Sequence, residues 1–417
     1  MKTDHGSKPL RVLYSFPHRL GAARICYTAW QQVRGVAEAG ADVLLFPASL
    51  CRAVPASVEV RPTLAWGTFR VPYKLVGSMR AFAWHDLLVS RRLRRLAGRI
   101  DIVHTWPLGG LRTLQTAADL GVPAVLERPN AHTRFAFEAV RKECERLGVS
   151  LPPTHEHAYK EDVLQIEEEE YGRAYRILCP SEFTRKTFLD RGFAPDKLAR
   201  HFYGVDESMY HVGDRSADPG RPFTALFVGV AAVRKGLHYA LEAWLRSPAH
   251  NSGVLLVAGE ILPAYAERLR GMLGHPSVKV LGHREDIACL MRNSDILLLP
   301  TVEEGFGLVC TEAMASGCVP IVSEACTDIC QHMENALVHP VGALETLTQH
   351  ITLVHEDRVL LAKLRETGVR RVPEITWSAA GRRLVDAYRE TIDMYANDCS
   401  TGGAPRHTPV RGRVIGA

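Results

Sequence analysis

Short apolar runs alternate with longer segments of helical spacing through most of the chain. In the first half these runs occupy residues 10–16, 41–47, 101–107, 122–129 and 175–181. Amphipathic segments follow three of them, at residues 25–40, 110–121 and 182–192. Strands that are apolar on both faces and alternate with helices indicate a parallel sheet covered on both sides. This half of the pattern predicts a doubly wound α/β domain.

A turn-rich segment divides the pattern in two. Residues 206–222 are rich in Gly, Asp, Ser and Pro and poor in apolar residues, which is typical of an interdomain linker. The rhythm then restarts, with apolar runs at residues 223–230, 253–260, 277–283, 295–301, 318–325 and 335–340. The sequence predicts two doubly wound, Rossmann-like domains, at residues 1–205 and 223–375. Because such sheets bind ligands at the carboxyl ends of their strands, we expect the site in an interdomain cleft.

Three other segments lie outside the repeating pattern. Residues 376–396 have helical spacing and follow the completed second sheet, so we expect this helix to pack back onto the first domain. The remainder, residues 397–417, is predicted to be disordered. Residues 145–172, with Pro-Pro, His-Glu-His and four consecutive glutamates, indicate a solvated helical excursion.

The composition narrows the class of protein. A net charge of +5 over 417 residues is too small to argue for a nucleic-acid-binding protein. The ten cysteines form no Cys-x-x-Cys pair, which is typical of reduced thiols in the cytoplasm. The polar N-terminus does not resemble a signal peptide, and no apolar run approaches the roughly 20 residues of a membrane span. We therefore expect a soluble, cytoplasmic protein.

The stretch EEGFGLVCTEAMASGCVPI, residues 303–321, carries the strongest chemical signal. The preceding strand ends at Pro300 and a helix is expected to begin near Leu308, so Gly305 and Gly307 lie in the turn between them. Glycines in such a turn let backbone N–H groups approach a phosphate at the helix N-terminus. Ordinary helix starts share this composition, so the turn alone leaves both interpretations open.

Two glutamates of this stretch, Glu304 and Glu312, have seven residues between them. Carboxylates repel phosphate, but they are good acceptors for sugar hydroxyls. A nucleotide sugar supplies both kinds of group, so the pattern favours a nucleotide sugar over phosphate alone.

A second loop of the same sheet is basic. The strand that ends at Gly229 is followed by Arg234 and Lys235, directly before a helix. Solvated surface cations are common, but these two lie at the ligand-binding edge of the sheet. There they would neutralise a diphosphate and stabilise it as a leaving group.

The first loop of the first domain, PHRLGAARI, is a third candidate. Gly21 permits close backbone approach to a ligand, and His18 and Arg19 lie beside it as either simple loop residues or site residues. His104 ends another strand, and we expect it in the core or at its rim.

Several motifs together resemble glycosyltransferase family 4, a group of retaining nucleotide-sugar enzymes with the GT-B fold. The spacing of Glu304 and Glu312 matches the E-x7-E pattern of that family, within the similar stretch EGFGL…EAMASG.VPI. Further similarity lies in VG…KG…A at 228–243, CPSEFTRKTF at 179–188 and YGVD at 203–206. The motifs agree in order and cover nearly the whole chain to about residue 396.

The resemblance implies a role for each matching residue. Glu304 would lie by the donor sugar, Glu312 would accept the ribose hydroxyls, Lys235 would bind the diphosphate, and Gly21 would lie under the leaving group near the acceptor. Other donor contacts would come from Gly229, Gly282, His283, Arg284, Gly305, Phe306, Gly307 and Leu308, with the base held by backbone contacts in the loop of Gly282 to Arg284.

Two positions depart from the family pattern. Many members carry arginine after the glycine of VG, where this chain has Val230, and Arg234 is the candidate to replace it in the catalytic set. The family's first-domain histidine, expected after the strand near residue 126, has no clean match in LERPNAHT. That segment offers His132, which we assign to catalysis, and Arg128, which we assign with His18 and Arg19 to the acceptor or donor-sugar side.

Three features of the sequence bear on contacts with a metal ion or a membrane. The chain has no D-x-D motif, which holds a divalent metal in the other main glycosyltransferase architecture, so we expect no metal and no cofactor beyond the nucleotide sugar. His155-Glu156-His157 is not expected to be a metal site. Residues 78–99 are basic and amphipathic and would suit contact with anionic lipid, or else form a domain helix with a solvated basic face.

The resemblance implies a retaining glycosyltransferase that moves a hexose-type unit to the hydroxyl of a glycan, lipid-linked or small-molecule acceptor, without nucleic acid as a partner. A GT-B epimerase or phosphorylase is the alternative within enzymes. A two-lobed sugar-binding protein shares the paired domains, but such proteins are normally exported.

Overall fold

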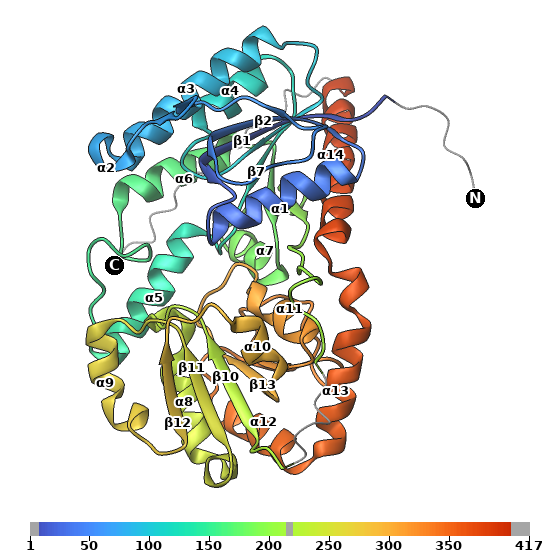
Figure 1. The fold of residues 1–417 in the computed structure, drawn as a ribbon. Coiled ribbons are helices and arrows are strands. Elements are labelled where there is room, and N and C mark those ends of the chain that lie inside the picture. Colours follow the sequence, from blue (N-terminus) through green and yellow to red (C-terminus); the bar gives the residue numbers. More distant parts are fainter. Residues whose placement is uncertain (1–7, 214–219, 402–417) are drawn as a thin grey trace, which may run out of the picture.

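The computed structural model describes residues 8–213 and 220–401, which form two α/β domains, one above the other in Figure 1. Each domain has one parallel sheet with helices on both faces. The predicted fold class, two doubly wound domains in tandem, is confirmed.

The first domain is built on a seven-stranded parallel sheet in the order β3-β2-β1-β6-β7-β8-β9. Its strands are β1 (Arg11–Leu20), β2 (Asp42–Leu50), β3 (Glu59–Val60), β6 (Ile102–Thr105), β7 (Ala124–Glu127), β8 (Arg176–Cys179) and β9 (Leu198–Arg200). Between β3 and β6 the chain forms a small antiparallel hairpin, β4 (Ala65–Trp66) and β5 (Phe69–Arg70), and the short helix α2 (Tyr73–Val76).

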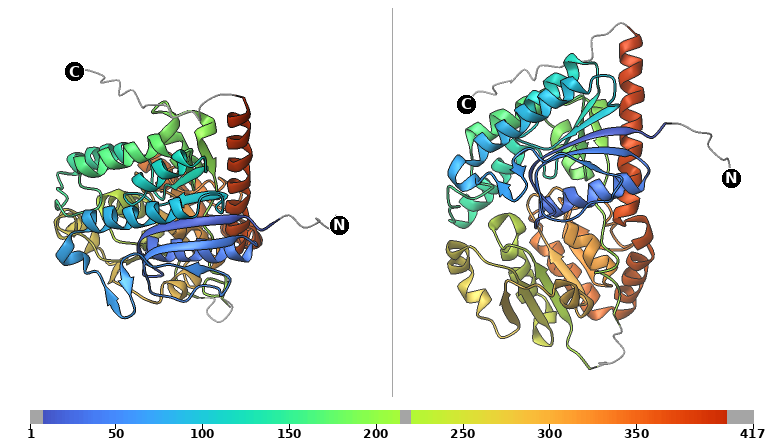
Figure 2. Two further views of the ribbon diagram at one scale, coloured as in Figure 1. Left: turned by 90° about the horizontal axis from the view of Figure 1, so that it is seen from above. Right: turned by 45° about the horizontal axis from the view of Figure 1, so that its top comes forward.

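Helices cover both faces of this sheet. One face packs against α1 (Ile25–Glu38) and the C-terminal helix α14 (Trp377–Ser400). The other face packs against α3 (Ser78–Arg95), α4 (Leu111–Asp119), α6 (Glu161–Arg173) and α7 (Glu182–Leu189). Figure 2 shows α14 crossing α1, and the two helices are in contact, so the end of the chain completes the first domain.

The second domain is built on a six-stranded parallel sheet in the order β12-β11-β10-β13-β14-β15. Its strands are β10 (Thr224–Val228), β11 (Val254–Ala258), β12 (Val278–Gly282), β13 (Ile296–Leu299), β14 (Val319–Ser323) and β15 (Leu337–His339). Its helices are α8 (Leu237–Arg246), α9 (Pro263–Leu273), α10 (Ile287–Arg292), α11 (Leu308–Ala315), α12 (Leu344–Glu356) and α13 (Arg358–Arg370).

The chain passes between the domains at two neighbouring points. Val205 pairs with Thr376 in an isolated parallel bridge, so the outgoing and returning segments lie side by side. Gly204 is required there, because a Cβ on it would lie 2.3 Å from the backbone nitrogen of Trp377. The paired crossings fix where the two domains meet.

Helix α5 (Thr133–Leu147) makes a third connection. It begins in the first domain, but Val140 and Cys144 belong to the same apolar cluster as Leu237 and other core residues of the second domain. In addition, the Glu143 carboxylate is hydrogen-bonded to Nε2 of His238, at 2.8 Å. The helix therefore ties the two cores together.

Two sequence predictions about flanking segments need correction. Helix α14 continues to Ser400, where Asp398 accepts a hydrogen bond from the Tyr175 hydroxyl at 2.9 Å, so residues 397–400 are not disordered; residues 402–417 lie outside the described residues. Residues 145–172 are not simply solvated either. Glu167 and Glu170 are buried, and Glu170 accepts hydrogen bonds from the backbone nitrogens of Leu108 and Gly110.

The α1–α14 contact provides a test of the fold. A Cβ on Gly381 would lie 2.2 Å from the backbone of Gly35, so Gly381→Ala forces the helices apart. We expect a loss of about 1–3 kcal/mol in the free energy of unfolding, measured by denaturant titration. The matched control is Gly172→Ala in α6, where nothing lies within 4 Å of the new methyl group; it should be neutral or stabilising. Equal effects of the two substitutions would contradict the close packing of the helices.

Candidate functional site

The order of strands in the second sheet reverses between β10 and β13, which are neighbours in the sheet but not in the chain. Loops at such a reversal turn to opposite faces and leave room for a ligand at the carboxyl ends of the strands. The loop after β10 carries Arg234 and Lys235, and the loop after β13 carries Glu303 and Glu304. The structure therefore brings the predicted cations and the first predicted glutamate to one place.

These four side chains form one ion cluster. Lys235 Nζ is hydrogen-bonded to Glu304 Oε2. One guanidinium nitrogen of Arg234 lies 3.4 Å from Glu304 Oε1 and 3.4 Å from Glu303 Oε2, and it donates to the Glu303 carbonyl oxygen at 2.9 Å. Two cations and two carboxylates thus balance each other.

The opposite charges of the cluster stabilise the ionised forms of its side chains. Burial alone would raise the pKa of Glu304, but the charges of Arg234 and Lys235 outweigh burial and lower it to about 2. Burial likewise opposes ionisation of Arg234, and the two glutamates outweigh it and raise the pKa of Arg234. Glu304 and Arg234 are therefore charged near neutral pH.

Backbone contacts hold the two loops against each other. Thr301 Oγ1 donates to the carbonyl oxygen of Arg234 at 2.8 Å. Gly236, with φ of 70°, ends the basic loop, and a Cβ there would lie 2.0 Å from the Pro300 carbonyl oxygen. Gly229 ends the preceding strand within reach of the Lys235 side chain. The cations are thus positioned by the backbone and not only by their ion pairs.

The turn from Gly305 to Leu308 is in contact with the first domain. A Cβ on Gly305 would lie 1.6 Å from the Pro129 carbonyl oxygen, and the Gly305 carbonyl accepts hydrogen bonds from Ser181 at 2.6 Å and Thr184 at 3.0 Å. Only glycine fits there.

Two further residues of this turn have distinct roles. Phe306 is buried against Tyr203 and Trp377, so its side chain anchors the turn rather than facing a ligand. Gly307, with φ of 78°, leads into α11 at Leu308, as the sequence predicts.

Glu312 lies on α11, past the turn. Tyr210, from the segment that enters the second domain, is hydrogen-bonded to its carboxyl group. Burial raises the pKa of Glu312 to about 7, and the bond from Tyr210 offsets only part of this effect. Unlike Glu304, Glu312 changes charge near neutral pH.

The predicted base-binding loop follows β12, two strands from β10. Gly282, with φ of 65°, accepts a hydrogen bond from the Gly259 nitrogen at 2.7 Å. His283 and Arg284 are exposed, and Arg284 pairs with Asp286 at 2.6 Å. Their side chains lie apart from the ion cluster, which agrees with a role limited to backbone contacts.

The loop after β1 begins later than the sequence suggests. His18 and Arg19 belong to the strand, which runs to Leu20. The His18 ring packs against Phe82, with ring centres 4.7 Å apart, and burial lowers its pKa to about 4, whereas Arg19 is exposed. Gly21 alone lies in the loop, with φ of 84°.

His132, which the sequence assigned to catalysis, lies in the first domain. Its ring caps α5, accepting from the Arg134 nitrogen at 3.2 Å, and packs against Tyr171 and Phe188. Burial, with the charges of neighbouring arginines, lowers its pKa to about 2. His132 is therefore neutral and is not a group of the ion cluster, and its role in catalysis stays a prediction.

Arg128 is also structural. It is buried, donates to the Ala131 carbonyl oxygen at 3.0 and 2.9 Å, and pairs with Glu167 at 3.1 Å. These bonds shape the loop that touches Gly305, so Arg128 acts on the site only through that loop. His104 is a core residue, as expected, and is hydrogen-bonded to the Tyr388 hydroxyl at 2.7 Å.

Sequence reasoning missed two residues of the site. Glu303 is completely buried, and its second oxygen accepts from the Ala131 nitrogen of the first domain at 3.1 Å. His157 Nε2 lies 3.5 Å from Glu303 Oε2. The paired glutamates and the His-Glu-His stretch were visible in the sequence, but only tertiary structure joins them.

Metal sites and membrane-spanning helices are two further features that the described residues could contain. Among residues 8–213 and 220–401, no group of three or more His, Cys, Asp or Glu side chains is placed to hold a metal ion. Metal independence remains a prediction. In the same part of the chain, no helix combines the length and apolar character needed to cross a membrane.

Known proteins with a similar sequence or fold include several glycosyltransferases. The chain is 28% identical to a GDP-mannose:cellobiosyl-diphosphopolyprenol alpha-mannosyltransferase of Xanthomonas campestris over 45% of its length, and the match spans about half (47%) of that relative. It is 24% identical to a D-inositol 3-phosphate glycosyltransferase of Frankia alni, over 87% of this chain and 93% of the relative. Among solved structures, sucrose-phosphate synthase from Thermosynechococcus elongatus shares the fold, with a TM-score of 0.65 and 17% identity over 94% of this chain and 100% of that one.

Two family models follow one another along the sequence. Glycosyltransferase Family 4 matches residues 27–208, and Glycosyl transferases group 1 matches residues 222–357. The boundary between them coincides with the passage from the first domain to the second. With the two-domain fold and the E-x7-E site described above, these matches show that the chain belongs to the family 4 type of GT-B glycosyltransferases.

Proposed function

We propose that this enzyme transfers a hexose-type sugar from a nucleotide diphosphate sugar to an acceptor hydroxyl, with retention of configuration and without a metal ion. One observation carries the proposal: Arg234 and Lys235 converge on Glu303 and Glu304 at the strand reversal of the second sheet. Retention is the outcome that the family resemblance implies. The cations supply the positive charge that a metal would otherwise provide.

The ion cluster suggests how the donor is bound. In this structure the two cations are neutralised by two carboxylates. A diphosphate carries stronger acceptors, and guanidinium and ammonium groups pair well with its oxygens. When the diphosphate replaces the glutamates as the partner of Lys235 and Arg234, Glu304 becomes free to accept hydrogen bonds from the hydroxyls of the sugar.

The proposed step has a simple balance. The bond between the anomeric carbon and the diphosphate oxygen breaks, and its electron pair leaves with the diphosphate. The acceptor oxygen forms the new bond to the same carbon from the same face, and its proton passes to the departing phosphate oxygen. Lys235 and Arg234 stabilise the charge that develops on that oxygen.

A cavity of about 660 Å³ in the first domain suits the acceptor. Its lining includes Ser49 and Leu50, which pair in the sheet with Arg19 and Leu20, directly before the Gly21 loop. The hairpin β4–β5 forms another wall. There Phe69 lines the cavity and is 59% exposed, with its ring stacked on that of the exposed Trp66, an arrangement suited to packing against a sugar ring.

The acceptor class and location are parts of the same proposal. The name of the Xanthomonas relative states a diphosphopolyprenol acceptor, which supports a lipid-linked or glycan acceptor here. The described residues contain no disulfide bond, which supports a cytoplasmic location. An enzyme acting on a lipid-linked acceptor would work at the inner face of the membrane.

Binding of the donor should depend on the ionisation of Glu312. Only the carboxylate can accept two ribose hydroxyls, and with a pKa of about 7 it is mostly protonated at pH 6 and mostly ionised at pH 8. We expect the affinity for the preferred nucleotide among UDP, GDP, ADP and their sugars to rise up to about tenfold over this range. Thermal-shift screening identifies the nucleotide, and calorimetry measures the affinity.

Glu312→Gln is the control for this experiment, because the phosphates of the ligand titrate equally in both proteins. Its affinity should be lower at pH 8 and should lack the additional pH dependence. If no nucleotide stabilises the wild type, the transferase proposal fails. If the two proteins respond equally, the ribose assignment to Glu312 is wrong. Acceptor-dependent release of nucleoside diphosphate excludes an epimerase, and independence from added phosphate excludes a phosphorylase.

The acceptor cavity is tested by Phe69→Ala. Loss of the exposed ring should raise the acceptor KM by about 2–10-fold and leave donor affinity unchanged, as measured by initial-rate kinetics. Trp84→Ala, which removes an exposed aromatic side chain of the first domain outside this cavity, should change neither value. Equal KM values for wild type and Phe69→Ala would place the acceptor elsewhere.

A further inference from the structure

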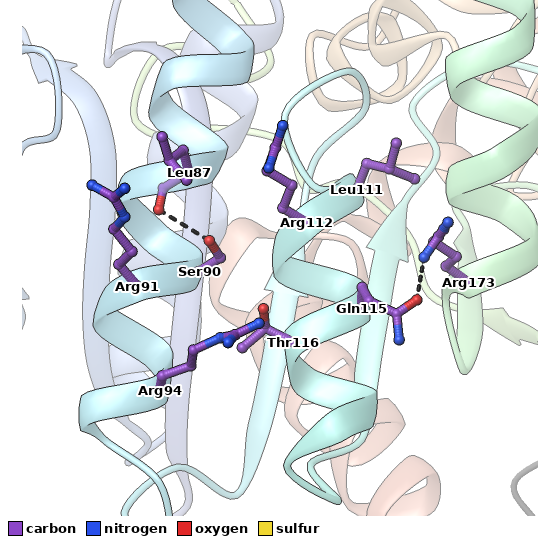
Figure 3. Close-up of a pocket in the computed structure, with 9 residues that line it drawn as sticks. All are labelled: Leu87, Ser90, Arg91, Arg94, Leu111, Arg112, Gln115, Thr116 and Arg173. Carbon is purple, nitrogen blue, oxygen red and sulfur yellow. Dashed lines mark hydrogen bonds between the residues drawn. The ribbon is translucent and has the colours of Figure 1, made fainter.

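A second basic site lies on the helical face of the first domain. A cavity of about 490 Å³ opens between α3 and α4 (Figure 3). Four arginines line it, from three helices: Arg91 and Arg94 of α3, Arg112 of α4 and Arg173 of α6. None of its lining residues belongs to the ion cluster of the donor site.

The packing of α3 explains why its arginines face outward. The apolar residues Phe82, Val89 and Leu93 are buried against the first domain. The sequence alone allowed an apolar stripe that could lie in lipid, but this stripe is used for packing within the domain. The side chains that α3 exposes to solvent are mainly arginines.

The positive charge of the cavity is only partly compensated within the protein. Arg173 pairs with Glu169 and is hydrogen-bonded to Gln115, and Arg94 lies 3.9 Å from Asp119. Within residues 8–213 and 220–401, the side chains of Arg91 and Arg112 have no ion pair or hydrogen bond.

A buried carboxylate beside Arg112, on which the charge of Arg112 acts, is already committed. Asp86 is buried, and its two oxygens accept from the backbone nitrogens of Arg112 and Thr113, at 2.7 and 2.9 Å, and from the Thr113 hydroxyl at 2.7 Å. It therefore holds the start of α4 in place and is not free to swing out to an arginine. The cavity keeps a surplus of positive charge.

The neutral part of the lining leaves space for a ligand. The Ser90 hydroxyl is bonded to the Leu87 carbonyl of its own helix, and Thr116 faces it from α4. In Figure 3, Arg94 reaches from α3 toward Thr116, while Arg91 and Arg112 extend from the two opposite helices. Guanidinium groups on two sides of a groove can hold one anion between them.

We propose that this cavity binds a phosphate group, separately from the donor site. Arg91 and Arg112 would pair with the phosphate oxygens, since guanidinium groups match phosphate geometry with two parallel hydrogen bonds. Arg94 and Arg173, which also line the cavity, would add positive charge. The phosphate is carried either by the headgroup of an anionic phospholipid or by a soluble phosphate compound, and the two sources share this chemistry.

The test compares two pairs of substitutions with equal loss of charge. The first pair, Arg91→Gln with Arg112→Gln, removes the two unpaired cations of the cavity. The second, Arg92→Gln with Arg95→Gln, removes two exposed arginines of α3 outside it. Binding to phosphatidylglycerol-containing vesicles is measured by sedimentation against pure phosphatidylcholine vesicles. Binding of pyrophosphate is measured by calorimetry in proteins that also carry Lys235→Met, which weakens binding at the donor site, whereas nucleotide binding is measured in proteins that keep Lys235.

We expect the first pair to weaken binding at least about tenfold and the second pair to change it less than twofold. Loss with vesicles alone identifies a lipid headgroup, loss with pyrophosphate alone identifies a soluble ligand, and loss with both supports phosphate recognition as such. Equal weakening by the two pairs would show a diffuse basic surface and overturn the proposal, as would a wild type that binds neither probe. Nucleotide binding at the donor site should be unchanged in both pairs, which also shows that the variants are folded.

Discussion

The pairing of Arg234 and Lys235 with Glu303 and Glu304 is the interaction on which the rest of the site depends. It joins the loops of two strands that are neighbours in the sheet but distant in sequence. Buried charges are tolerated only when they are paired, so each loop requires the other. The same pairing holds the cations where we propose that the diphosphate leaves, and it keeps Glu304 ionised near neutral pH.

The first domain completes this arrangement. Ala131 donates to Glu303, the Pro129 carbonyl meets Gly305, and Ser181 and Thr184 bond the Gly305 carbonyl oxygen. Helix α5 leaves this region and ends in the core of the second domain. A ligand that displaces the glutamates therefore acts on contacts between the domains as well as on contacts within one loop. We therefore expect binding and the relative position of the domains to be coupled through these few residues.

The sequence predicted the fold well because parallel strands and their helices are specified by local apolar patterns. It also predicted the donor loops, since glycines, cations and E-x7-E spacing are local features of one segment. It was less informative where a role depends on distant partners. His132 has the residue type of a catalytic group, yet aromatic neighbours bury it. The role of Glu303 depends on Ala131 and His157, more than a hundred positions away in the chain. The crossing of α5 into the second core has no signature in its own amphipathic pattern.

We propose that the cations of the cluster pass from the glutamates to the diphosphate. The decisive measurement is calorimetry of the nucleoside diphosphate and of its nucleotide sugar with wild type, Lys235→Met and Glu304→Gln. Lys235→Met should weaken both ligands about tenfold or more. Glu304→Gln should weaken only the nucleotide sugar, because this substitution removes a competitor of the diphosphate and a partner of the sugar. Equal weakening of both ligands by Glu304→Gln, or no effect of Lys235→Met, would rule out this exchange of partners.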